Sequence, residues 1–173
     1  KEQEFALCYP VQVNRAWAKA RLSGGEQVSG IAGRMEAIAA VNGAFFAATG
    51  RPLGLLMIDG ELISEPYASR TALGLGPKLA VMERVGFRGE VTLDDGSRLT
   101  TLQGLNRPRL QDELILYTRQ YGTTTNTNAF GLEAVVLDGE VVRIEQGNST
   151  IPPGGFVLSA HGVQRERLGQ LAV

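Results

Sequence analysis

The segment 134–144, AVVLDGEVVRI, places an Asp-Gly pair between two apolar runs. Asp and Gly tolerate positive φ, so this pair favours a type I′ turn and a β-hairpin. The same arrangement occurs at 54–63, around Asp59-Gly60, and at 90–102, where DDGS joins the two runs. Three such hairpins in one chain predict a sheet-dominated fold.

Other apolar runs extend this prediction outward from the hairpins. We expect further strands at 37–41, 72–75, 79–82, 114–118 and 156–159, and a mostly extended stretch at 5–22. The spacing of Val28, Ile31, Ala32 and Met35 predicts one helix, and 163–171 a second. The expected fold is therefore α+β, a β-rich mixed sheet built from several Asp-Gly hairpins with a few short helices.

Composition sets limits on the class of protein. The chain has 173 residues, of which 43% are apolar, and its 17 Lys+Arg and 18 Asp+Glu give a net charge of −1. This balance argues against a nucleic-acid partner. A single cysteine and a single histidine exclude an internal disulfide, a thiolate zinc cage and a multi-histidine site, so we expect neither metal nor cofactor. No apolar run is long enough for a transmembrane helix.

Two motifs in the first half of the chain carry groups suited to a ligand. Asn42 follows a small apolar stretch with Phe46 nearby, and an amide at a strand end can reach a ligand. The alternative is a turn with one core and one surface phenylalanine. Arg70 opens the run 72–75, where a planar guanidinium can clamp phosphate or carboxylate. Such an arginine also commonly pairs with a surface carboxylate.

The second half of the chain contains a polar run at 123–128, TTTNTN. Short uncharged donors and acceptors suit sugar hydroxyls or phosphate oxygens, but a solvated loop with Asx and Ser/Thr turns fits them equally well. Thr125 and Asn128 are the candidate ligands in this run. Asn106 and Arg109 precede the strand predicted at 114–118, and Tyr117 lies within that strand.

Glu133 and His161 are the candidate acid–base groups. Alternation along the strand places Glu133 on one face with Val135 and Leu137. Burial there would raise the pKa of the carboxyl group, as a general acid requires, whereas a strand-edge position would leave it solvated. His161 follows the strand predicted at 156–159, where catalytic groups often lie, although a single histidine is more commonly structural.

Taken in order, these segments resemble the phosphodiester glycosidase family, which is related to the lysosomal enzyme that removes N-acetylglucosamine from phosphodiester-linked mannose. The similarity runs over about residues 28–162. It consists of 39–46 (AAVNGAFF), 52–54 with 59–62, 69–74 (SRTALG), 105–109 (LNRPR), 116–118 with 121–128, 131–133, and 151–152 with 155–162. The shared order of these motifs makes the resemblance specific.

The resemblance implies a hydrolase that cleaves the glycosyl–phosphate bond of a sugar-1-phosphodiester, with N-acetylglucosamine as the expected sugar. It implies that Arg70 and Arg109 bind phosphate and that Glu133 and His161 supply acid–base groups. The residues implied to contact the sugar or orient other groups are Asn42, Phe46, Asn106, Tyr117, Thr125 and Asn128. It also implies a secreted or cell-envelope location, with a carbohydrate phosphodiester, exopolysaccharide or envelope glycan as partner.

Two departures from the family pattern matter. The family has Asn-Gly-Gly where this chain has Asn42-Gly43-Ala44. Nothing after His161 resembles the family's Asp-Gly-Gly-Gly-Ser segment. We therefore expect one domain over 1–173 that is incomplete at its C-terminus and associates with that segment or with a second copy. A non-catalytic module that binds envelope glycans is the alternative function, and a purely structural half-domain is a third.

Overall fold

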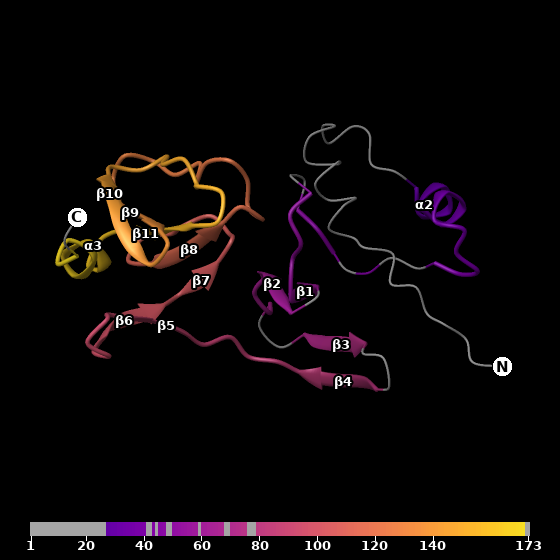
Figure 1. Ribbon diagram of the computed structural model, residues 1–173. Coiled ribbons are helices and arrows are strands. Elements are labelled where there is room, and N and C mark those ends of the chain that lie inside the picture. The colour runs from indigo at the N-terminus through magenta and orange to yellow at the C-terminus, as the bar shows by residue number, and fades with distance from the viewer. Residues whose placement is uncertain are drawn as a thin grey trace.

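A five-stranded mixed sheet organises the second half of the chain (Figure 1). The computed structural model describes residues 27–40, 43, 45–47, 50–58, 60–67, 70–75 and 79–171. The sheet order is β10-β9-β11-β8-β7, and only β7 and β8 pair in parallel. Its strands are β7 (Gly104–Leu105), β8 (Leu114–Thr118), β9 (Leu132–Leu137), β10 (Glu140–Glu145) and β11 (Phe156–Ala160). The predicted β-rich α+β class with a mixed sheet is thus confirmed.

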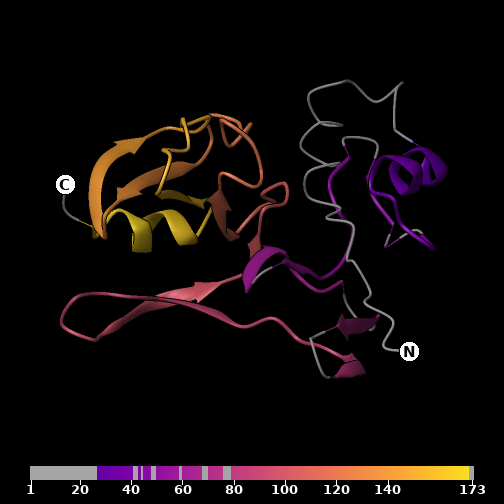
Figure 2. The same cartoon turned by 45° about the vertical axis from the view of Figure 1, so that its right-hand side comes forward.

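Three two-stranded hairpins and two helices complete the described elements. The hairpins are β1 (Leu56–Ile58) with β2 (Glu61–Ser64), β3 (Thr71–Leu75) with β4 (Ala80–Arg84), and β5 (Gly89–Thr92) with β6 (Arg98–Leu102). Helix α2 spans Val28–Arg34 and α3 spans Gln164–Leu168. Figures 1 and 2 show the two helices at opposite ends of the molecule. No helix in the described ranges is long and apolar enough to cross a membrane.

The Asp-Gly turns form as predicted in one hairpin and differently in another. Asp138 and Gly139 have φ of 53° and 88°, the pair of positive values that a type I′ turn requires. The β5–β6 loop is longer, and only Gly96 takes a positive φ there. The Asp95 carboxylate accepts a hydrogen bond from the Ser97 backbone N–H at 2.8 Å. The type I′ prediction was therefore wrong for that loop, because the Asp95 side chain stabilises a wider turn.

The five-stranded sheet packs apolar side chains on both faces. One face buries Leu114, Ala134 and Leu158, and Leu168 of α3 covers them. The other face buries Tyr117, Val135 and Val157 beneath Ile151 of the loop before β11. This division follows the two-residue alternation of strands. The same alternation puts Glu133 and Ser159 on the loop-covered face, so buried polar side chains lie beside the apolar ones there.

Some predicted elements were wrong or shorter than expected. Residues 37–40 form no strand, because α2 closes through a hydrogen bond from Ala37 N–H to the Ala32 carbonyl, and an alanine-rich run has little tendency to form a strand. The second helix is shorter than the predicted 163–171. The two-residue strand β7 was not among the predicted strands. Residues 5–22, Val41 and Asn42 lie outside the described residues.

Candidate functional site

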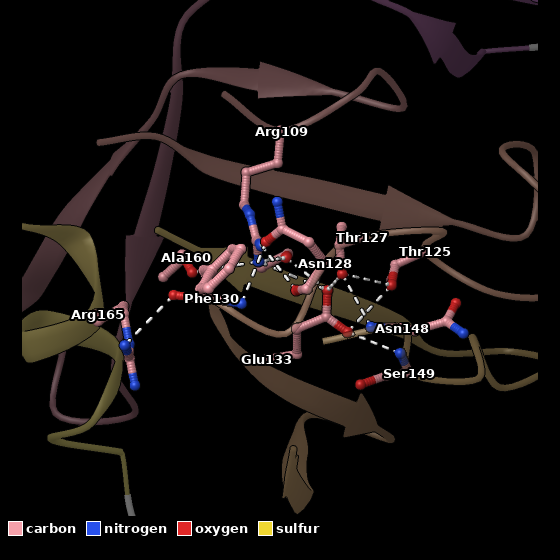
Figure 3. A network of polar contacts seen from close by, with 11 residues as sticks. Arg109, Thr125, Thr127, Asn128, Phe130, Glu133, Asn148, Ser149, Ala160 and Arg165 are labelled. Carbon is pink, nitrogen blue, oxygen red and sulfur yellow. Dashed lines mark hydrogen bonds and ion pairs between the residues drawn. The ribbon is translucent and has the colours of Figure 1, made fainter. Parts of the chain in front are cut away.

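A buried carboxylate is the centre of a polar network on the loop-covered face (Figure 3). Glu133 is completely buried in β9. Its Oε1 accepts hydrogen bonds from the hydroxyls of Ser159 and Thr127, each at 2.6 Å. Its Oε2 accepts from the Thr125 hydroxyl at 3.0 Å and from the Ser149 backbone N–H at 2.8 Å. Both carboxylate oxygens are thus fully engaged by protein donors.

These donors decide the ionisation state of Glu133. Burial raises the pKa of its carboxyl group, but the hydrogen bonds from Ser149, Ser159 and Thr127 outweigh burial, and the pKa lies below its ordinary value of 4.5. Of the two alternatives for Glu133, the structure shows the buried position on the shared strand face and not the solvated strand-edge position. The raised pKa expected for a general acid is wrong, because several donors aimed at the carboxylate stabilise its charged form.

Arg109 supplies the positive charge of this network. Its side chain is only 1% exposed, and Nη1 lies 3.9 Å from Oε1 of Glu133. Nη1 donates to the Ser159 hydroxyl at 2.7 Å and to the Ala160 carbonyl, while Nη2 donates to the carbonyl and side-chain oxygens of Asn128. Ser159 therefore accepts from Arg109 and donates to Glu133. Burial lowers the pKa of Arg109, and the charge of Glu133 opposes this.

The polar run at 123–128 is held against a second loop. The Thr125 N–H donates to the Ser149 carbonyl at 3.1 Å, and the Asn148 N–H donates to the Thr127 hydroxyl at 2.9 Å. Gly147 allows this contact, since a Cβ there would lie 2.2 Å from the Asn128 carbonyl oxygen. Two of the run's hydroxyls thus point inward to Glu133 rather than to solvent.

Asn106 has a bracing role in the structure. It is 2% exposed, with φ of 51°. Its Nδ2 donates to the Ile63 carbonyl and to the Thr118 hydroxyl, both at 2.9 Å, and its Oδ1 accepts from the Thr118 N–H at 2.8 Å. The amide predicted to contact a sugar is therefore used to join β2 to β8.

Arg107 makes a second internal link between the same regions. Its guanidinium contacts Glu65, which follows β2, at 2.7 Å and Glu113 at 2.6 Å. It also donates to the carbonyls of Gln103 and Pro108. The hydrogen bond to Glu113 raises the pKa of Arg107 despite the opposing effect of burial. Like Arg109, this arginine is committed to contacts within the chain.

Arg70 lies at the start of β3, apart from the Glu133 network, and is exposed. Its Nη1 donates to the Leu53 carbonyl at 3.0 Å. Its guanidinium carbon lies 4.8 Å from the ring centroids of both Phe45 and Tyr67. The other guanidinium donors have no partner among the residues that the structure describes. Nearby, Phe46 forms an isolated bridge with Pro52 and is 57% exposed.

Tyr117 and His161 carry buried polar atoms with no hydrogen-bond partner in the described part of the chain. The Tyr117 ring is fully buried and packs edge-on against Tyr121, with centroids 4.8 Å apart. Burial raises the pKa of its phenol far above 10.0. A sugar cannot reach this ring in the present structure. His161 lies just beyond β11, and its Nδ1 is the unpartnered atom.

The structure therefore brings together four predicted site residues, Arg109, Thr125, Asn128 and Glu133. It places Arg70, Asn106 and Phe46 outside that network, whereas the Tyr117 phenol lies close enough to Arg109 and Glu133 to interact with their charges. Thr127, Ser149 and Ser159 complete the network and were not singled out from the sequence. Within the described residues, no group of three or more His, Cys, Asp or Glu side chains could hold a metal ion.

Comparisons with known proteins give one structural neighbour. No family model and no curated protein matches the chain. The crystal structure of a hypothetical protein from Synechocystis is similar, with a TM-score of 0.71 and 25% sequence identity. The match covers 84% of this chain and 29% of the Synechocystis chain. This protein thus shares its fold with part of a considerably longer protein.

Proposed function

We propose that this protein hydrolyses the bond between the anomeric carbon of a sugar and a phosphodiester oxygen, and that Arg70 receives the phosphate. The observation that carries the proposal is the state of Arg70. Arg107 and Arg109 are both engaged by carboxylates and carbonyls of the chain. Arg70 is exposed, oriented by one carbonyl and two rings, and keeps donors for a bidentate contact with an anion.

The proposed reaction needs little help from a strong general acid. Water adds to the anomeric carbon, the bond from this carbon to the phosphodiester oxygen breaks, and the products are a free sugar and a phosphate monoester. A phosphate ester is a stable leaving group, so the enzyme mainly stabilises the oxocarbenium-like transition state and the charge of the departing phosphate. A fixed guanidinium such as that of Arg70 suits the second task.

Glu133 takes a positioning role in this proposal. A carboxylate that accepts four hydrogen bonds and has a lowered pKa holds no proton to donate near neutral pH. It instead fixes Arg109 and the 123–128 run. His161, whose Nδ1 is unpartnered, remains the acid–base candidate in the described chain. We propose N-acetylglucosamine as the sugar, and an exopolysaccharide or envelope phosphodiester outside the cytoplasm as the setting.

The test is release of N-acetylglucosamine from an α-N-acetylglucosamine-1-phosphodiester. The assay uses the 173-residue chain and the longest polypeptide that contains it. Each of the two is also assayed as the Arg70→Gln variant. We expect turnover in at least one form and a loss of about 100-fold in kcat/KM in the variant. Arg88→Gln is the matched control, because Arg88 is 80% exposed and pairs with surface Glu90. Equal activity of Arg70→Gln and wild type, with both folded, would refute the assignment.

One observation favours a second candidate, a non-catalytic module that binds envelope glycans. The buried carboxylate is ionised and saturated, which is the state of a structural group rather than of an acid catalyst. This candidate predicts saturable glycan binding without turnover, even in the longest polypeptide. The same assay, run beside a binding titration, distinguishes the two functions.

A further inference from the structure

Arg70 and its two aromatic neighbours are fixed together by backbone contacts. The Leu53 N–H donates to the Phe45 carbonyl at 2.9 Å, and the Leu53 carbonyl accepts from Arg70 Nη1 at 3.0 Å. The Arg70 N–H donates to the Tyr67 carbonyl at 3.1 Å. Gly54 has φ of 134°, and a Cβ added to it would lie 3.9 Å from the Cβ of Tyr67. Three segments thus place the guanidinium and the rings before any ligand arrives.

The two rings remain open to solvent in this arrangement. Phe45 is 72% exposed and Tyr67 is 58% exposed. Cation–π contact with Arg70 uses part of each ring and leaves much apolar surface exposed. Aromatic rings at this level of exposure lie beside a cation whose other donors have no partner among the described residues, and these are the two features that bind an amphipathic anion.

We propose that Phe45 and Tyr67 bind the apolar C–H face of a pyranose whose phosphate lies on Arg70. The ligand class is a glycosyl phosphate, since the rings suit a sugar ring and the in-plane N–H donors of arginine suit phosphate oxygens. This inference rests on the proposed function for the identity of the anion. It adds that the rings discriminate a glycosyl phosphate from a phosphate without a sugar.

The test is calorimetric titration of the 173-residue chain with two probes, N-acetylglucosamine-1-phosphate and inorganic phosphate. The variants are Phe45→Leu and Tyr67→Leu, each checked for an unchanged thermal midpoint. Phe130→Leu is the matched control, because Phe130 is also 72% exposed and makes no contact with Arg70. We expect each ring variant to lose about tenfold in affinity for the sugar phosphate and little for inorganic phosphate.

Three results would overturn the inference. These are no measurable binding of the sugar phosphate to the wild type, unchanged binding in both ring variants, and an equal loss for both probes, which would mean that the rings only orient Arg70. The proposed hydrolysis is judged separately. Ring-dependent binding without turnover supports this inference and refutes the hydrolysis. Arg70-dependent turnover with unchanged KM in both ring variants supports the hydrolysis and refutes this inference.

Discussion

Replacing Glu133 by Gln removes the negative charge at the centre of the buried network while nearly preserving its volume. The Gln amide oxygen can keep the hydrogen bonds to one carboxylate oxygen, but its NH₂ group faces donors on the other side. Two charge-assisted hydrogen bonds are lost, at roughly 1.5 kcal/mol or more each. Arg109, which is 1% exposed, also loses its counter-charge. Breaking a buried pair in this way typically costs about 3–5 kcal/mol.

We therefore expect Glu133→Gln to lower the free energy of unfolding by about 3 kcal/mol. Urea unfolding followed by far-UV circular dichroism measures it. With an m-value of about 2 kcal/mol/M for a domain of this size, the midpoint should fall by about 1.5 M. The control is Glu145→Gln, because Glu145 lies opposite Glu133 on β10, is partly exposed and pairs with Arg143. Its change should stay within about 0.5 kcal/mol.

Equal unfolding midpoints for the two variants would refute this reasoning. Such a result would mean that the network is held by the surrounding loops rather than by the charge. A double variant with Arg109→Met provides a second check. Because it removes both charges, it should be less unstable than the sum of the two single changes.

Three further predictions concern stability. The folded-state pKa of Glu133 is depressed, so its contribution to the free energy of unfolding is complete above about pH 4.5 and declines as pH falls toward the folded-state pKa. The urea midpoints of wild type and Glu133→Gln should therefore converge as the pH is lowered from about 7 to about 3. A constant difference between the two midpoints would contradict this. Asn106→Ala should cost about 1–3 kcal/mol and speed amide exchange in β2, whereas Asn148→Ala, at the same φ of 51°, reports only the backbone effect; equal losses would refute the bracing role. Gly155→Ala, whose Cβ would lie 2.2 Å from a β9 carbonyl oxygen, should lower the thermal stability by about 1–3 kcal/mol, whereas Gly86→Ala, with nothing within 4 Å, should not; matching thermal midpoints would contradict the contact.

The hairpins could be predicted from sequence because their signals are local. Asp138 and Gly139 tolerate the positive φ values that their turn requires, and the flanking apolar runs are long enough to form strands. The run at 37–41 marks the limit of this approach. A few small apolar residues are compatible with a strand, but the Ala37 N–H closes the end of the preceding helix, and residues 38–40 form no strand. Local pattern alone does not reveal that competition.

The candidate site could be predicted only in part, since its chemistry depends on strand register. Alternation left burial of Glu133 as one of two alternatives, and the direction of its pKa shift depends on donors from other segments. Ser159 is the clearest case, because it faces Glu133 through the β11–β9 pairing. No spacing within the sequence shows that a serine 26 residues away is the partner of this carboxylate. The same holds for Ser149, whose backbone N–H completes the shell.

The measurement that tests the proposed function most directly is hydrolysis of the N-acetylglucosamine phosphodiester in ¹⁸O-labelled water. A glycosidase breaks the bond at the anomeric carbon, so the account predicts the label in the released sugar and none in the phosphate monoester, with the rate strongly reduced by Arg70→Gln. Label in the phosphate would show cleavage at phosphorus instead. That result, or the absence of release from every folded form of the protein, would contradict the account.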